Sequence, residues 1–115
     1  MTLNGKEVIF KLTNAATAER YEQALKNMQD KGEELEKHPL EGLAANIRAQ
    51  IDMVREFVDT IFGPGEWEIL ETDHDDLDEN IDLVEQIIQE SERQKDALQR
   101  RVSKYDPRRN KRGRS

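Results

Sequence analysis

The sequence predicts a mainly α-helical domain with a short N-terminal β-hairpin, three amphipathic helices and a disordered basic C-terminal tail. Charged residues make up 37% of the 115 residues and aromatic residues only 5%, a composition more typical of elongated helical proteins than of compact enzymes. Proline occurs at only three positions, 39, 64 and 107, which leaves long uninterrupted segments for helices. Apolar residues recur at helical spacing in three of these segments. We therefore expect one domain, residues 1–105, followed by a tail, residues 106–115.

Residues 2–12 are predicted to form the β-hairpin. Asn4-Gly5 fits a type I′ turn, in which both central residues need positive φ. After the turn, Val8, Phe10 and Leu12 alternate with the residues between them, as in a strand with one buried face. The first strand is very short, so the hairpin must pack against helices, unless the N-terminus is mobile.

The first helix is predicted over residues 15–37. Thr13-Asn14 supplies a short polar side chain that can cap its first turn, and Pro39 ends it. Gly32 interrupts the apolar stripe and costs roughly 1 kcal/mol relative to alanine, so we expect a bend or fraying there. The stripe consists of Ala18, Tyr21, Leu25, Met28 and Leu35.

The second helix is predicted over residues 40–62 and has the widest apolar face. A face this wide contacts more than one neighbour, which makes this segment the best core helix of the chain. Its stripe consists of Leu40, Leu43, Ala44, Ile47, Ile51, Val54, Val58 and Ile61, widened by Met53, Phe57 and Phe62.

Gly63-Pro64-Gly65 ends the second helix, and residues 66–70 form either one helical turn or a short extended piece. The third helix is predicted over residues 75–105. Polar residues occupy its seam at Ser91 and Lys95, so we expect its C-terminal half to leave the core and to reach a second copy or another protein. The seam consists of Leu77, Ile81, Val84, Ile88, Leu98, Val102 and Tyr105, with Ile87 and Ala97 beside it.

Residues 66–85, here called the acidic belt, hold ten acids and no lysine or arginine. Its spacing fails the calcium-loop pattern, because Leu77 and Val84 stand where ligands are needed. Acids at the start of the third helix are favoured by the helix dipole, and the belt can also form a patch for a basic partner. Trp67, the only tryptophan, either fills the core or anchors an interface, and we favour the core.

No catalytic constellation is present in the sequence. The chain has no cysteine, its two histidines, His38 and His74, have no ligand spacing and are expected to be exposed, and no nucleophile has a base in register. We expect no enzymatic activity and no cofactor. Residues 106–115 carry five basic side chains without aromatic residues, so nucleic acid is an improbable main ligand for a chain of net charge −7. No stretch approaches the roughly 18 apolar residues of a membrane span.

Three segments together resemble a family of small tail assembly chaperones of phages and prophages of Gram-positive bacteria. They are LNGKEVIFKLTNAATAERYEQAL, in which a hairpin leads directly into a helix, REFVDTIFGPG, an aromatic helix end, and KYDPRRNKRGRS, a basic ending. The acidic belt is heavier than this family leads us to expect.

The resemblance implies a non-enzymatic helper in the cytoplasm of the bacterial host. Such chaperones coat the tape measure protein, keep it soluble and help recruit tail tube subunits, and we expect a homo-oligomer. A rival hypothesis is a phage-encoded inhibitor of a host defence factor that acts through the acidic belt. The candidate partner-binding residues are Phe57, Ile61, Phe62, Trp67, Leu98, Val102 and Tyr105.

Overall fold

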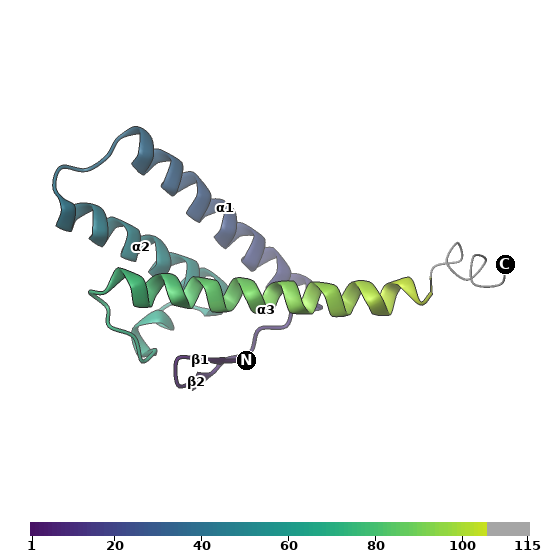
Figure 1. Ribbon diagram of the computed structural model, residues 1–115. Helices are drawn as coiled ribbons and strands as arrows, with labels where there is room; N and C mark the ends of the chain where they lie inside the picture. Colours follow the sequence, from purple (N-terminus) through teal and green to yellow (C-terminus); the bar gives the residue numbers. More distant parts are fainter. Residues whose placement is uncertain (106–115) are drawn as a thin grey trace.

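The structure, a computed structural model, describes residues 1–105 and confirms the predicted fold class (Figure 1). Within these residues the chain forms a two-stranded antiparallel hairpin, three α-helices and one turn of 3-10 helix. In chain order the elements are β1 (Thr2–Leu3), β2 (Lys6–Glu7), α1 (Ala15–Lys37), α2 (Leu43–Phe62), η1 (Trp67–Ile69) and α3 (Leu77–Ser103). The predicted disordered tail, residues 106–115, lies outside the described residues.

The hairpin turns at Asn4-Gly5, as predicted. Both residues have positive φ, 41° at Asn4 and 78° at Gly5, which is the backbone geometry of a type I′ turn. The strands are shorter than predicted, because the pairing of β1 with β2 ends at Glu7 and residues 8–12 form no strand. The prediction of a hairpin over residues 2–12 was therefore wrong in its second half.

Val8 still exchanges backbone hydrogen bonds with Met1 (2.9 and 3.0 Å), but residues 10–12 bond to α3 instead of to a strand. The side chain of Gln94 donates to the carbonyl of Phe10 (2.6 Å) and accepts from the amide of Leu12 (2.8 Å). The predicted alternation of burial is present all the same, since Val8 and Phe10 are buried and Ile9 is 90% exposed. One amide side chain thus takes the place of a β-ladder and ties the N-terminal segment to α3.

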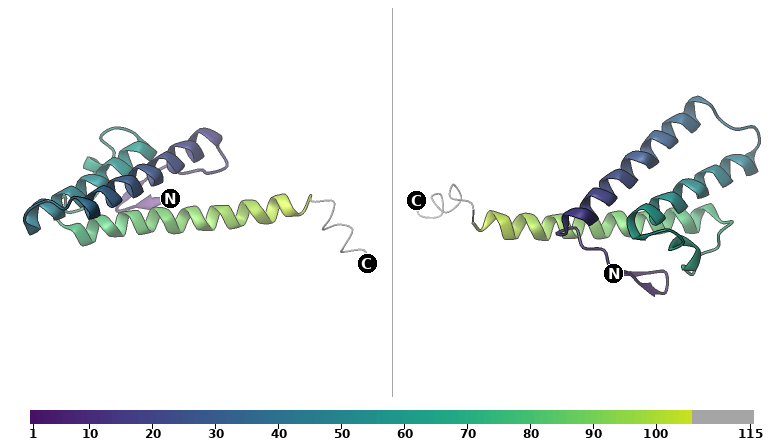
Figure 2. Two further views of the ribbon diagram at one scale, coloured as in Figure 1. Left: turned by 90° about the horizontal axis from the view of Figure 1, so that it is seen from above. Right: turned by 180° about the vertical axis from the view of Figure 1, so that it is seen from behind.

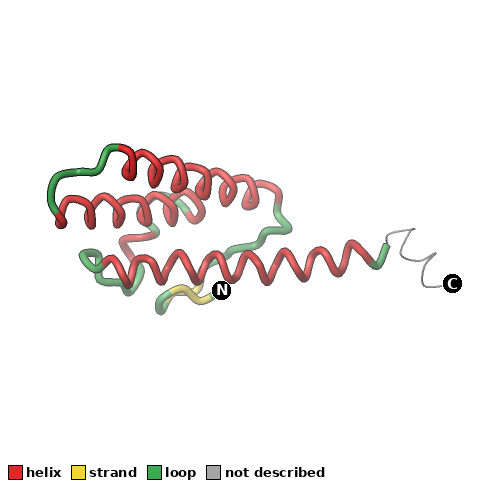
Figure 3. The backbone as a smooth tube through the Cα atoms, turned by 45° about the horizontal axis from the view of Figure 1, so that its top comes forward, coloured by secondary structure: helices red, strands yellow, loops and turns green. Residues whose placement is uncertain are grey.

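α1 and α2 form an antiparallel pair, and α3 lies across it (Figures 1 and 3). α1 has the predicted bounds, is capped by Asn14, whose side-chain oxygen accepts from the amide of Thr17 (3.1 Å), and continues through Gly32. α2 begins at Leu43 rather than at residue 40, because Gly42 holds φ at 95° and so stands outside the helix. The first residues of the predicted stripe are consequently exposed, Leu43 to 78%.

The buried face of α3 lies one residue away from the predicted seam. Ile81, a predicted seam residue, is 40% exposed, whereas Leu83 is fully buried. The cause is that Asn80, a polar residue, occupies a core position because it has a hydrogen-bond partner there, and apolar spacing alone selects the neighbouring stripe over residues 77–88. Ser91, which belongs to the predicted seam, is buried as well. The buried side chains of α3 are Asn80, Leu83, Ile87 and Ser91.

The core gathers side chains from every element except β2 around α2, which contributes the largest share, as predicted. Its aromatic residues meet edge to face: the ring centroid of Phe10 lies 5.4 Å from that of Tyr21 and 5.8 Å from that of Phe62, in the geometry that aromatic pairs prefer. The buried apolar residues are Leu3, Val8, Phe10, Tyr21, Ala24, Ile51, Val54, Phe57, Val58, Ile61, Trp67, Leu70, Leu83 and Ile87.

α3 is the longest helix, at 27 residues, and it extends beyond the other elements at its C-terminal end (Figure 2). Among residues 1–105, none of the helices combines the length and the apolar composition needed to traverse a lipid bilayer.

Candidate partner-binding surface

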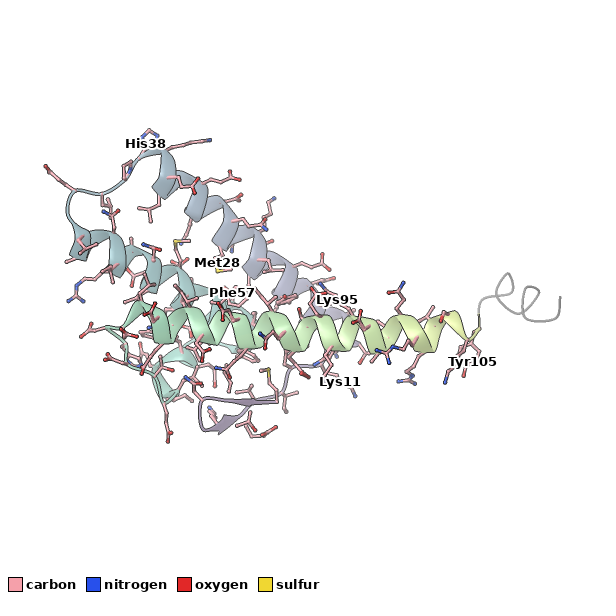
Figure 4. All side chains as sticks on the ribbon, viewed as in Figure 1. Lys11, Met28, His38, Phe57, Lys95 and Tyr105 are labelled. Carbon is pink, nitrogen blue, oxygen red and sulfur yellow. The ribbon has the colours of Figure 1, made fainter. Side chains whose placement is uncertain are left out.

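Residues 95–105, which are the last part of α3 and the two residues after it, leave the body of the molecule, and we call this segment the arm. Ser91 is the last buried residue of α3, and of the arm only Ser103 is not exposed. Figure 4 shows Lys95 beside the start of α1 and Tyr105 at the far end of α3. This confirms the prediction that the C-terminal half of the third helix leaves the core.

Leu98, Val102 and Tyr105 continue the core-facing side of α3 along the arm. They follow the buried Ile87 and Ser91 at steps of seven, four and three residues, which keep side chains on one helical face. Their exposed fractions are 39%, 61% and 82%, so exposure rises toward the tip. Near the middle of α3 this face packs on α1 and α2. Along the arm, no element within residues 1–105 covers it.

Polar residues mark the place where α3 leaves the core. The hydroxyls of Tyr21 and Ser91 bond to each other (2.8 Å), and Ser91 also donates to the carbonyl of Ile88 (2.6 Å). The ammonium of Lys95 lies 5.7 Å from the centroid of the Tyr21 ring, within cation–π range. These satisfied contacts explain the polar gap in the predicted seam.

A mainly apolar groove of about 300 Å³ lies between α1 and α3 where the arm begins, and we call it the α1–α3 groove. Because Leu98 lines it, the groove and the apolar face of the arm form one continuous surface. It was not predicted, since its walls come from two parts of the chain that are far apart in the sequence, residues 12–25 and residues 94–98. Its lining residues are Leu12, Thr13, Ala18, Tyr21, Glu22, Leu25, Gln94, Lys95 and Leu98.

A second apolar groove, of about 180 Å³, lies between the helices near the start of α3 and is called the corner groove. Ile81 and Val84 of the predicted seam line it together with Met28 and Met53, and Glu85 stands at its rim. Its remaining lining residues are Gln50, Val54 and Leu77.

Part of the acidic belt has structural roles. Asp76 caps α3 by accepting from the amide of Glu79 (2.9 Å), and the carboxylate of Glu79 accepts from the amide of Asp73 (2.6 Å). Two belt acids pair with cations of other segments, Glu66 with Lys6 (2.9 Å) and Asp75 with Arg48 (3.2 Å). Within the described residues, the carboxylates of Glu68, Asp78 and Glu85 have no such bond, and they are exposed.

Trp67 lies in the core and is not an exposed anchor. Its indole Nε1 donates to the side-chain oxygen of Asn80 (2.8 Å), and its backbone amide donates to Asp59 (2.9 Å). His74, exposed as predicted, stacks on the indole with ring centroids 4.1 Å apart. Residues 66–70, predicted as one helical turn or an extended piece, contain the 3-10 turn η1, which begins at Trp67.

The candidate partner-binding residues therefore separate into two groups. Phe57, Ile61 and Trp67 are buried in the core, and Phe62 is partly buried against Phe10. These side chains offer little or no surface to a partner. Leu98, Val102 and Tyr105 are exposed and lie together on the arm.

An ion pair stabilises α3 where it leaves the body. The Arg93 guanidinium donates to Glu90 (Nε to Oε2, 2.9 Å) and lowers the pKa of that carboxyl to about 2. Within residues 1–105 no group of three or more His, Asp or Glu side chains is placed to hold a metal ion. What the described residues do present is an exposed apolar surface with charged neighbours.

Comparison with known proteins gives one match. No curated protein and no solved structure matches the chain. The model of a family of unknown function, DUF6673, matches residues 4–115, which is nearly the whole sequence, and the chain belongs to this family.

Proposed function

We propose that this protein is a phage tail assembly chaperone that acts by binding alone, in the cytoplasm of the bacterial host. Its client is the tape measure protein, and it helps to recruit tail tube subunits to that client. The observation that carries the proposal is the continuous apolar surface of the arm and the α1–α3 groove, which no described element covers. The identity of the client comes from the resemblance of the three sequence segments. The proposed activity involves no cofactor, nucleic acid or membrane.

The shape of this surface suits an amphipathic helix. Helices are commonly bound by laying their apolar face into a groove, with anchors at spacings of three, four and seven residues. Leu98 and Val102 present such spacing from the arm, and Leu12, Ala18 and Leu25 provide apolar walls in the groove. A tape measure protein is a long helical molecule, and its apolar stripe would be shielded from water by this contact.

A single contact of this kind is weak, which suits a chaperone that must later be released. Covering the exposed part of Leu98, Val102 and Tyr105 gains about 1 kcal/mol for each side chain, since full burial of a large apolar side chain is worth about 1.5–3 kcal/mol. Several copies bound along one client reach useful avidity without a strong individual site. This is why the proposal includes a homo-oligomer on the client.

Co-expression with the tape measure protein of the same gene cluster tests the proposal. We expect the two proteins to co-purify and the soluble fraction of the client to rise. Replacing both Leu98 and Val102 by serine is expected to abolish both effects. Ile9→Ser is the matched control, because Ile9 is equally apolar and 90% exposed but lies away from this surface. Failure of the wild-type chain to bind or solubilise the client refutes the proposal, as does an equal loss with the control.

The rival function, inhibition of a host defence factor through the acidic belt, is supported by the exposed carboxylates of Glu68, Asp78 and Glu85. It is the weaker candidate because other belt acids bond within the chain, and Asp76 in particular caps α3. Asp78→Lys with Glu85→Lys separates the two functions: it abolishes capture of a basic partner if the belt is the binding site, and leaves client binding intact if the α1–α3 groove is the site.

A further inference from the structure

Charge is strongly divided along α3. Residues 77–92 carry six acids and no base, whereas residues 93–105 carry five bases and one acid. Acids at the start of a helix and bases at its end complement the helix dipole, but that effect fades within one turn at each end. Here each sign extends over several turns, so the dipole alone does not account for the division.

Each charged end also has an apolar patch. At the basic end, Val102 and Tyr105 are exposed, and Arg101 lies one turn before Tyr105 on the same face. We call this the arm tip. At the acidic end, Ile81 is 40% exposed at the corner groove. Exposed apolar residues are thus accompanied by positive charges at the C-terminal end of α3 and by negative charges at its N-terminal end.

The corner groove has acids on both sides of its exposed apolar residue. Asp78 precedes Ile81 by three residues and Glu85 follows it by four, so the three side chains share one face of α3. Met28 and Met53 form the opposite wall, and the flexible thioether side chain of methionine adapts well to an incoming group. The groove therefore suits an apolar side chain with a neighbouring cation.

The arm tip and the corner groove cannot meet within one chain. They lie on one continuous helix of 27 residues, which at 1.5 Å per residue spans about 40 Å. Pairing two arm tips side by side places Arg100, Arg101 and Lys104 against the same cations of the other copy, which is repulsive. Complementary charges meet only when the tip of one copy reaches the groove of another.

We propose that copies of this chain associate head to tail, with the arm tip of one copy seated in the corner groove of the next. Val102 and Tyr105 cover Ile81 and its methionine neighbours, while Arg101 and Lys104 face Asp78 and Glu85. A contact between two different surfaces repeats from copy to copy into a ring or an open chain, or closes into a two-fold dimer in which each tip fills the other copy's groove. The association requires no client, so the purified chain alone tests it, although Val102 also belongs to the surface proposed for the client.

The test uses the purified full chain alone, followed by analytical ultracentrifugation over a range of concentrations. We expect the average mass to rise with concentration and to fall when salt is added, since exposed charge pairs are screened. The tip variant carries Arg101→Glu and Lys104→Glu, and the corner variant carries Asp78→Lys and Glu85→Lys. Each variant alone is expected to be monomeric, because like charges then meet at the contact.

Mixing the two variants is the decisive measurement. In the mixture the acidic tip of one variant meets the lysines of the other's groove, and both contacts become complementary again, so association returns. A control variant with Glu33→Lys and Glu36→Lys, exposed on α1, has the same net charge as the corner variant and associates like the wild type.

Three results overturn the proposal. A wild-type chain that stays monomeric at every concentration excludes the association. A corner variant that associates normally assigns the contact to another surface. A mixture that stays monomeric, although both variants show the helical circular dichroism of the wild type, shows that the two surfaces do not bind each other.

Discussion

The buried hydrogen bond between Trp67 and Asn80 offers the sharpest test of how the corner between α2 and α3 is held. Asn80 is fully buried, and its side chain makes three bonds: it accepts from the Trp67 indole (2.8 Å) and donates to the carbonyls of Asp73 (3.1 Å) and Asp76 (2.7 Å). One side chain thus joins η1, the loop and the first turn of α3. We expect Asn80→Ala to loosen all three together.

The expected loss of unfolding free energy in Asn80→Ala follows from the hydrogen bonds that each partner loses. The indole N–H of Trp67 is left buried without an acceptor, which costs about 1–3 kcal/mol. The two carbonyls lose a donor, but each keeps one backbone bond, to the amides of Asp76 (3.1 Å) and Asn80 (3.3 Å), so their share is smaller. We expect a total loss of about 3 kcal/mol, a large part of the stability of a small domain.

Urea denaturation followed by circular dichroism measures this loss, and Trp67 fluorescence serves as a second probe in variants that retain it. Trp67→Phe removes the other partner and gives the double-mutant cycle, in which we expect a coupling of about 1–2 kcal/mol between two residues in contact. A loss below about 0.5 kcal/mol for Asn80→Ala, the range of an ordinary surface change, would falsify the assignment of this residue to the core.

Two further predictions concern the backbone at two glycines and the ion pair between Glu90 and Arg93. Gly63 has φ 124° and ψ 157°, a region essentially reserved for glycine, so Gly63→Ala should cost about 1–3 kcal/mol. Gly32→Ala, in a regular helix where the new methyl group would lie 3.6 Å from Met53, should instead stabilise by up to about 1 kcal/mol; a thermal melt of both variants checks the opposite signs. For the ion pair, the pKa of Glu90 lies at about 2, below its ordinary value of 4.5, so the pair stabilises the fold above pH 4.5 and is lost as the pH falls toward 2. Because Arg93 is exposed, Glu90→Gln should cost only about 0.5 kcal/mol at pH 7 and should flatten the stability profile across that window; an unchanged profile contradicts the assignment.

Element boundaries were predictable where a local signal sets them. Asn14 and Pro39 are capping and terminating residues whose effect needs no tertiary contact, and the first helix has its predicted bounds. The end of α2 at Phe62 follows in the same way from the Gly63-Pro64-Gly65 turn. The start of α2 was placed too early because Gly42 was not recognised as the residue outside the helix.

The register of α3 was not predictable from apolar spacing. Asn80 is buried because Trp67, from a separate element, satisfies its side-chain oxygen. A sequence pattern shows the polar residue but not its partner, so the stripe with more apolar residues was preferred. The same limit applies to the candidate site: the arm was predicted from the polar gap in its own helix, whereas the α1–α3 groove needs walls that only the folded chain brings together.

The arm itself argues for a binding role. From Ser91, the last buried position, α3 continues to Ser103, which is about 18 Å of helix at 1.5 Å per residue. Helices of this length are marginal in water when nothing packs against them. A helix that only had to complete the core would end near Gln94, where the last contacts to the N-terminal segment are made. Beyond Gln94 the helix exposes Val102 and Tyr105, and these apolar side chains add little to the stability of the fold because they are not buried. We propose that a partner covers this surface, either the client or a second copy of the chain.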